Sequence, residues 1–325
     1  MEKSKKKVIA IAFSDLHLNL WAKFNKDYKR TQDSFRVLFK IKEVCSKYNV
    51  PALFCGDLFH KPEVIQKELF TKLIKQFLKL NGTSFKCYAI SGNHDIMEIS
   101  KVGIQPKSWV YDLDPLFPWL YDLDYRAFRL TPNIQVHGIP YVDHNIGLST
   151  YLKKMKLEDG YKHILLLHTD YPGAKDTDGR VVDSAENINL NMLSRFDLVL
   201  CGHIHKPQRL SKKVYMLGAP IQQRRTDKDC KMGYWLVMDD LSTKFVELKG
   251  FPKFIDVETE DEVKEDGNYY TVIPKTQRVE VKSSHKITKQ LSKSRLAKRY
   301  LKEKGINDKT KEGLLIKVLK ESESC

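Results

Sequence analysis

The chain has 325 residues, of which 42% are hydrophobic and 10% aromatic, a composition that suits a soluble globular protein with a sizeable core. At this length we expect one large domain, or one domain with a smaller attachment. The net charge of +15 favours a polyanionic partner, with nucleic acid ahead of an acidic membrane surface. No apolar run approaches the length of a membrane span, which argues against a transmembrane protein.

The cysteines and the N-terminus point to an intracellular, cytoplasmic protein. The chain has six cysteines and no Cys-x-x-Cys pair, and Cys55, Cys87 and Cys201 lie within apolar runs, as small buried hydrophobic residues do. The lysine-rich residues 1–7 before the apolar run 8–13 loosely resemble a signal peptide. The apolar part is too short for one, and we interpret it as the first strand.

The first third of the chain alternates strand and helix patterns. Apolar runs of buried-strand length lie at residues 8–13, 52–55 and 85–90, and helical spacing is found at 31–48 and 63–80. This alternation predicts an α/β fold with a parallel or mixed sheet covered on both faces. In such folds the functional residues lie at the carboxyl ends of the strands.

The middle of the chain is less regular. Residues 107–125, rich in Trp, Tyr, Pro and Asp, indicate loops with short helices, and a short helix is expected at 189–195. Further strands are expected at 134–140, 163–168, 196–200, 214–217, 234–238 and 244–248. A turn at 239–243 indicates that the domain ends with antiparallel strands.

Composition shifts after Gly250. Residues 251–281 hold eight acidic and four basic side chains, whereas 282–325 hold thirteen basic and five acidic ones. We therefore expect a main domain at 1–250, a small α+β cap at 251–281 and a basic helical tail at 282–325.

Residues of the types that commonly bind metal ions follow the apolar runs. They are Asp15 and His17, Asp57, Asn93 with His94 and Asp95, His168, and the pair His203 and His205 in Gly-His-Ile-His. Histidines two apart on a continuing strand would point to opposite sides, so a turn after Gly202 is needed to bring both to one site. Ligands at the ends of several strands predict a metal centre.

The ligand types suggest two cations. Asp15 and His17 can grip one and Asn93 and His168 a second, with Asp57 bridging them and His203 and His205 completing the set. Carboxylate, amide and imidazole donors without thiolate suit manganese, iron or zinc. Two such cations polarise a phosphoryl oxygen and activate a water nucleophile, and His94, beside a ligand, can supply charge stabilisation and a proton.

The order Asp-x-His, Gly-Asp, Gly-Asn-His-Asp, His and Gly-His-x-His resembles the calcineurin-like binuclear metallophosphoesterases over most of residues 8–250. The resemblance implies a four-layer α/β/β/α sandwich. It assigns the first metal to Asp15, His17, Asp57 and His205, and the second to Asp57, Asn93, His168 and His203. It also makes His94 the transition-state stabiliser or acid, and His60 a second phosphate-facing histidine.

Within that family the chain resembles the SbcD-type DNA double-strand-break repair nucleases and their phage relatives. Gly56-Asp-Leu-Phe-His60 carries a histidine found in part of that group, and residues 217–222 resemble its Gly-Ser-Pro-Ile-Gln segment, with Ala219 in place of the serine. The cap and helical tail fit the same layout. This resemblance implies a manganese-dependent DNA exonuclease and endonuclease, a homodimer, and a coiled-coil SbcC-type ATPase as partner.

Several residues keep two interpretations. Gln222, Arg224 and Arg225 fit DNA-backbone contacts or a solvated loop, and the aromatic cluster at 109–125 fits a dimer interface, which we prefer, or the core. Asp170 is interpreted as a loop carboxylate. His137, His144 and His163 match no motif, and surface or core roles are expected.

Two rival functions stay open. The first is a binuclear phosphoesterase for a phosphoprotein, a cyclic nucleotide or a small phosphate ester; the basic charge and tail count against it. The second is a non-catalytic scaffold, which the complete ligand set disfavours. The imperfect apolar stripes on two predicted helices of the tail favour docking on the ATPase over completion of the core.

Overall fold

A computed structural model describes the chain except for residues 1–5, 63, 99–100, 143–146, 183–189 and 275–325. By its internal contacts the chain divides after Ile273, and the elements below belong to the first unit. The predicted tail at 282–325, the end of the predicted cap and His144 lie outside the described residues.

The first of two six-stranded sheets has the order β14-β13-β1-β2-β3-β6. Its strands are β1 Val8–Phe13, β2 Ala52–Cys55, β3 Cys87–Ile90, β6 Leu120–Asp122, β13 Gly233–Met238 and β14 Thr243–Glu247. The strands β1, β2, β3 and β6 are parallel, whereas β13 runs antiparallel to both β1 and β14. The domain therefore does close its sheet with antiparallel strands.

The second sheet has the order β11-β12-β10-β9-β8-β7. Its strands are β7 Ala127–Thr131, β8 Ile134–Gly138, β9 Lys162–His168, β10 Leu198–Gly202, β11 Gln208–Arg209 and β12 Val214–Met216. The four inner strands are parallel, and the two edge strands are antiparallel.

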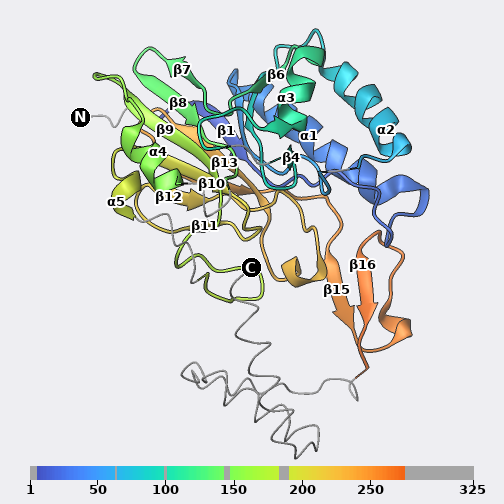
Figure 1. Cartoon of the computed structure of the whole chain (residues 1–325). Helices are drawn as coiled ribbons and strands as arrows, with labels where there is room; N and C mark the ends of the chain where they lie inside the picture. Colours follow the sequence, from blue (N-terminus) through green and yellow to red (C-terminus); the bar gives the residue numbers. More distant parts are fainter. Residues whose placement is uncertain (1–5, 63, 99–100, 143–146, 183–189, 275–325) are drawn as a thin grey trace, which may run out of the picture. The chain divides into compact units, whose positions relative to one another are not determined.

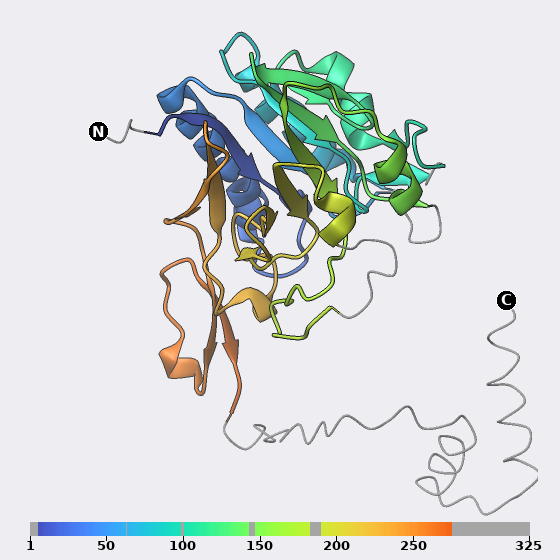
Figure 2. The same cartoon turned by 90° about the vertical axis from the view of Figure 1, so that its left-hand side faces the viewer.

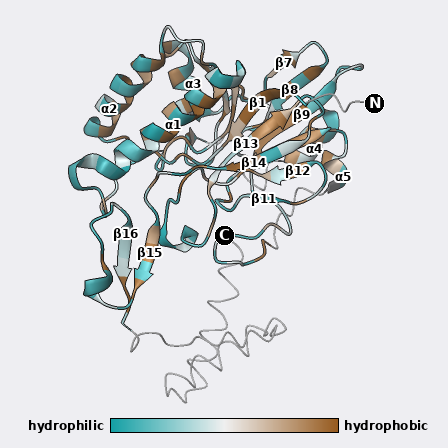
Figure 3. Ribbon diagram, turned by 180° about the vertical axis from the view of Figure 1, so that it is seen from behind, coloured by the Kyte–Doolittle hydropathy of each residue, from teal (hydrophilic) through white to brown (hydrophobic). Residues whose placement is uncertain are grey.

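Alternate residues of β1 show how the layers form. Ile11 and Phe13 face a core shared with α1 Lys29–Tyr48, α2 Lys67–Phe77 and α3 Trp109–Leu113. Ala10 and Ala12 face the opposite way, into a core that joins the two sheets. Successive side chains of a strand point to opposite faces, so one apolar run serves two layers. The strands are correspondingly the most hydrophobic part of the ribbon (Figure 3).

The outer face of the second sheet packs on α4 Leu148–Lys154 and α5 Leu190–Leu193. The layers are therefore helix, sheet, sheet and helix (Figures 1 and 2). This confirms the expected α/β sandwich. Single-turn 3₁₀ segments lie at Lys26–Tyr28, Leu78–Leu80, Asp114–Leu116, Arg225–Asp227 and Glu260–Glu262, and a small pair joins β4 Ile96–Glu98 to β5 Lys107–Ser108.

Past Gly250 the chain forms a separate pair of parallel strands, β15 Phe254–Val257 and β16 Tyr269–Val272. Both views show this pair beyond the two large sheets (Figures 1 and 2). It contacts the main domain through Phe24, whose ring stacks on Tyr269 with centroids 5.1 Å apart.

Three details differ from the sequence-based expectations. The helix expected at 63–80 begins only at Lys67, because Gln66 is extended with ψ 141°. The strands β4, β5, β6, β7 and β11 were not predicted; β7 is an edge strand that contains Arg129 and has no buried residue, so it lacks a continuous apolar run. In the 109–125 cluster, Trp119 is buried in the core, which corrects the interface interpretation for that residue.

Candidate metal centre

The two sheets bring their carboxyl ends to one edge, where the motif residues lie. Asp15 follows β1, Asp57 follows β2 and Asn93 follows β3, while His168 ends β9 and His203 follows β10. Strands that are parallel present their carboxyl ends at the same edge of a sheet, and two stacked sheets bring two such edges together. Five segments far apart in sequence thus meet at one place.

Sharp turns direct these side chains inward. Asp15, His17, Asp57 and His203 have left-handed φ angles of 56°, 48°, 61° and 94°, which residues other than glycine rarely adopt. Such strain persists where the surrounding structure imposes it, and it concentrates at functional sites. The turn at His203 redirects the chain after Gly202, as the spacing of the two histidines required.

Gly202 lets the second sheet approach the first at this edge. A Cβ atom there would lie 2.1 Å from Ser14 Oγ and 2.2 Å from the Cys55 carbonyl oxygen, so only glycine fits without a shift of the backbone.

Asp15, His17 and His205 form a first group of donors. Their ligand atoms all lie within 4.8 Å of one another. The Nε2 atoms of His17 and His205 are 3.0 Å apart, and His17 Nε2 lies 4.0 Å from Asp15 Oδ1.

Asp57, His168 and His203 form a second group with the same spacing, joined by Asn93. Asn93 Oδ1 lies 3.1 Å from His168 Nε2 and 2.9 Å from His203 Nδ1. Asp57 Oδ2 reaches both groups, at 3.3 Å from His168 Nε2 and 3.6 Å from His17 Nε2. The two predicted shells, including the bridging carboxylate, therefore lie side by side.

The proton positions implied by the hydrogen bonds fit metal binding. His168 Nδ1 lies 2.7 Å from the Cys55 carbonyl oxygen, so this nitrogen carries a proton and donates it. In the neutral ring Nε2 is then an unprotonated acceptor, yet it faces Asn93 Oδ1 and Asp57 Oδ2. Acceptors that converge without a donor repel one another, and a cation between them removes that repulsion.

Ionisation also favours cation binding. Burial lowers the pKa of His17 well below its ordinary value, which keeps the ring neutral and able to ligate. Burial opposes the charge of Asp57, but the neighbouring His168 and His17 outweigh it and hold the pKa of that carboxyl below its usual range. Likewise, burial alone would lower the pKa of His168, but Asp57 raises it to about 9. Without a cation, a second proton on His168 Nε2 thus compensates the Asp57 charge, and a bound cation would replace that proton.

His94 and His60 lie next to the first group. The His94 backbone N–H donates to Asp57 Oδ1 at 2.9 Å, and His94 Nδ1 lies 2.7 Å from the His60 carbonyl oxygen. The two rings stack with centroids 5.5 Å apart, and the His17 ring lies 5.0 Å from that of His94. Burial, with a smaller effect of His94, lowers the pKa of His60 to about 4. His17, His60 and His94 form a third group with donor spacing.

Three carboxylates support the centre, and sequence reasoning gave none of them this role. Buried Asp95 accepts from the backbone N–H groups of Asp57, Phe59 and Gly92, and so holds two of the ligand loops together. Its place in Gly-Asn-His-Asp was the available signal.

The other two carboxylates face the ligand histidines. Asp170 Oδ1 lies 3.3 Å from His203 Nε2, and Asp227 Oδ2 lies 3.5 Å from His205 Nδ1. Each carboxylate engages the ring nitrogen that faces away from the centre. Asp170 lies two residues after His168, but its interpretation as a loop carboxylate did not include this contact. For Asp227 no sequence pattern indicated a supporting role.

The three residues predicted to contact DNA differ in their exposure and in their contacts. Gln222 is buried; its amide donates to the Lys228 carbonyl and accepts from Phe254 N–H. One end of the amide thus bonds within the main domain and the other to the cap, and the contact of Gln222 with DNA stays a prediction. Arg224 and Arg225 are exposed, and Arg225 pairs with Asp256 at 2.6 Å.

The histidines outside the motifs, where described, have core positions. His137 Nε2 lies 2.9 Å from His163 Nδ1, and both residues are buried between β8 and β9. Cys55, Cys87 and Cys201 are free and buried, as their apolar surroundings predicted.

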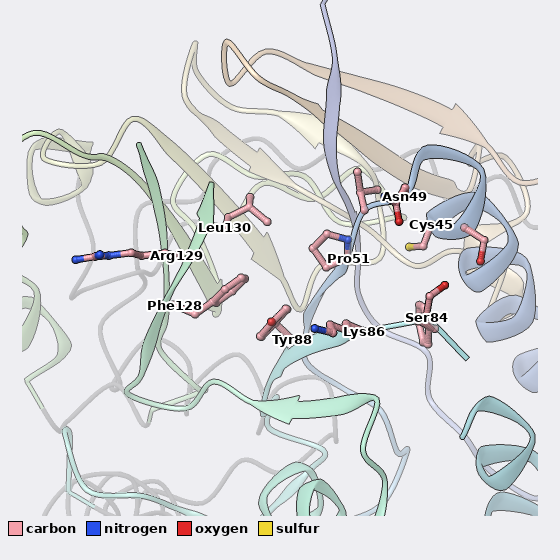
Figure 4. Close-up of a pocket in the computed structure, with 12 residues that line it drawn as sticks. Cys45, Asn49, Pro51, Ser84, Lys86, Tyr88, Phe128, Arg129 and Leu130 are labelled. Atoms are coloured by element: carbon pink, nitrogen blue, oxygen red, sulfur yellow. The ribbon is translucent and has the colours of Figure 1, made fainter. Parts of the chain in front are cut away.

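A surface hollow of about 290 Å³ lies elsewhere (Figure 4). Pro51 and Lys86, which immediately precede β2 and β3, line it. It is therefore at the amino ends of these strands, away from the metal centre, and takes no part in the site.

Comparison with known proteins agrees with this geometry. The family model of the calcineurin-like phosphoesterases matches residues 10–207, and the chain belongs to this family of phosphoester hydrolases with a binuclear metal centre. No curated protein matches the chain. Within the described part of the chain, no helix is both long and apolar enough to cross a membrane.

Solved structures add only distant likenesses. The crystal structure of TT1561 of Thermus thermophilus is 15% identical, with a TM-score of 0.44, over 73% of this chain and 97% of that chain. Another crystal structure is 11% identical, with a TM-score of 0.46, over 75% of this chain and 100% of that chain. Likenesses this low carry no argument about substrate.

Proposed function

We propose that this phosphoesterase is a metal-dependent DNA nuclease of the SbcD type, an exonuclease on duplex ends and an endonuclease on single strands. The observation that carries the proposal is a complete two-metal donor set in a chain of net charge +15. Such a charge attracts a polyanion, and two cations close together stabilise both the attacking and the leaving oxygen in phosphodiester cleavage. The motif Gly56–His60 and the cap add the support described above.

The ligand assignment proposed is that of the two donor groups, with Asp57 shared. Cations held there supply Lewis-acid stabilisation of the phosphoryl group and activate water. The mixed imidazole and oxygen donors favour manganese over magnesium, which prefers oxygen shells.

His94 is the proposed proton donor to the leaving oxygen. Its Nδ1 is occupied by the His60 carbonyl oxygen, so Nε2 is the nitrogen available to transfer a proton. The His94 N–H bond to Asp57 fixes the ring relative to the metals. His60, stacked on His94, is the proposed second phosphate-facing group.

The proposed assembly contains a homodimer and a coiled-coil ATPase of the SbcC type, bound through residues 282–325. The support is the layout of the chain and the basic, amphipathic character of that segment. A cytoplasmic location follows from this role in DNA repair or recombination.

The test compares substrates in metal-stripped protein reloaded with manganese or magnesium. We expect cleavage of linear duplex and single-stranded DNA with manganese and little with magnesium alone. The control variant Asp57→Asn should lose activity on every substrate. Hydrolysis of bis-p-nitrophenyl phosphate or a phosphopeptide without DNA cleavage would instead favour the rival phosphoesterase.

A further inference from the structure

A pocket of about 740 Å³ lies between the cap and the segment that joins β1 to α1. The main-domain side contributes Trp21, Lys23, Phe24 and Arg30, together with Arg224. In Figure 1 the blue segment before α1 runs just above β16. Cations and aromatic rings thus line the same wall of the pocket.

Aromatic contacts connect this pocket to the metal centre. The Trp21 ring lies 4.8 Å from that of His60, and the Arg30 guanidinium lies 3.8 Å above the Trp21 ring centroid. Arg30 also lies 5.4 Å from the ring centroids of Phe254 and Tyr269 in the cap. A strand that leaves the metals past His60 therefore meets this surface next.

Phe24 is the most exposed aromatic residue among those that line the pocket. Its ring packs on Tyr269, yet 39% of the residue stays exposed. Its backbone is left-handed, with φ 57°, a strained conformation for an aromatic residue. The left-handed backbone and the exposed apolar ring both cost free energy. A ligand that covers the ring would offset part of that free energy.

Charge favours a nucleic acid as that ligand. Lys23 and Arg224 are exposed, and Arg30 is buried with its guanidinium donating to the Gln223 carbonyl. One carboxylate, Glu260, also lines the pocket, and Arg225 is already paired with Asp256. The cations of the pocket outnumber its carboxylate, and aromatic faces interleaved with cations bind unpaired bases and their phosphates.

We infer that this pocket binds single-stranded nucleic acid leading to or from the metal centre, with a base stacked on Phe24. The inference rests on the proposed nuclease function. It adds the surface that holds the unpaired strand.

The test measures binding of a fluorescent single-stranded oligonucleotide in EDTA by anisotropy. Phe24→Ala should weaken binding about 5- to 100-fold, the range for loss of one base–aromatic stack, whereas Phe24→Trp should restore it. Phe70→Ala is the matched control, because Phe70 on α2 is similarly exposed at 40%; its binding should equal that of the unmodified protein.

Cleavage assays distinguish a failure of the pocket inference from a failure of the proposed nuclease function. In Phe24→Ala the ratio of oligonucleotide cleavage to bis-p-nitrophenyl phosphate hydrolysis should fall by a similar factor. If the unmodified protein cleaves single strands and folded Phe24→Ala binds and cleaves equally well, the pocket is not the strand site. If the unmodified protein hydrolyses the small diester but neither binds nor cleaves DNA, the nuclease function fails as well.

A competition experiment identifies the chemistry recognised. Unlabelled oligonucleotide should displace the probe far better than polyglutamate of equal charge. Equal displacement by polyglutamate would show that the surface recognises acidic peptide, and would overturn the inference.

Discussion

At the residue scale, four of the site histidines have one ring nitrogen in contact with a group outside the centre, which leaves the other for ligation or proton transfer. The partners are the Cys55 carbonyl for His168, Asp170 for His203, Asp227 for His205 and the His60 carbonyl for His94. Such contacts fix the tautomer and the ring orientation, and carboxylate partners raise the basicity of the ligating nitrogen.

Asp170→Asn should therefore weaken metal affinity about 10- to 100-fold, because the amide holds the His203 proton less strongly than the carboxylate does. Calorimetric titration with manganese measures this directly. Asp178→Asn, a change in the same loop region at an exposed carboxylate, serves as control. Equal manganese affinities for all three proteins would mean that Asp170 does not support the metal site.

His94→Asn should lower turnover about 10²- to 10⁴-fold, the usual effect of losing a general acid, with metal affinity near that of the unmodified protein. The backbone N–H that holds Asp57 remains in the variant. Single-turnover kinetics and metal titration together decide the matter. Because His94 also has donor spacing with His17 and His60, a large loss of metal affinity would instead make it a ligand.

At the element scale, strand ends of the two sheets are pressed together at glycines. Gly202 at the end of β10 lies against Ser14 and Cys55 of the first sheet, which allows His203 and Asn93 to face the same space.

Gly202→Ala should destabilise the fold by about 3 kcal/mol, the upper part of the range for overpacking, and should reduce metal affinity as the sheets separate. Gly82→Ala is the control: Gly82 has φ 72° but nothing within 4 Å of an added Cβ, so only about 1 kcal/mol of backbone strain is expected. Urea unfolding of both variants gives the comparison. A loss at Gly202 no larger than the loss at Gly82 would mean that the close contact between the sheets does not govern this position.

The neighbouring strands β8 and β9 carry a pH-dependent element. Burial, and secondarily His163, lowers the pKa of His137 to about 4, below the unfolded value of about 6.5. The neutral folded form therefore gives full stability above pH 6.5, and stability falls as the unfolded chain takes up the proton between pH 6.5 and 4.

Unfolding by urea at pH 7.5 and 4.5 should show this loss. The fall in the free energy of unfolding between these two pH values should be about 2–3 kcal/mol smaller in His137→Gln than in the unmodified protein, because a glutamine does not titrate. Identical pH dependence in the two proteins would show that the pKa of His137 is the same in the folded and the unfolded chain.

At the scale of the whole molecule, three apolar layers that draw on residues from Val8 to Leu241 stabilise the sandwich. The chain divides after Ile273, so the basic segment beyond is expected to serve association and not the core.

Deletion of residues 282–325 should leave the melting temperature and the metal-dependent hydrolysis of a small diester unchanged within error. Binding to the proposed ATPase should be lost. Thermal unfolding, the diester assay and co-purification with the ATPase measure these effects. An insoluble or unfolded product would show that the segment completes the core.

The sequence by itself determined the strand ends and the candidate ligands. A buried parallel strand appears in the sequence as a continuous apolar run. A polar residue at the end of such a run is therefore expected at the carboxyl end of the strand, and this rule located Asp15, Asp57, Asn93 and His168. The edge strand β7 escaped prediction, because only its alternate residues Phe128 and Leu130 pack on the core, so that it shows no continuous apolar run.

Only the tertiary structure decided which residues support those ligands. Asp170 and Asp227 reach their histidines through the packing of separate loops, and Gln222 joins the cap by a contact that depends on where β15 lies. The pocket beside Phe24 likewise forms between segments more than two hundred residues apart in sequence. Local patterns record which side chains are buried or follow a strand, but a contact between distant loops depends on how the layers pack, and no local pattern encodes it.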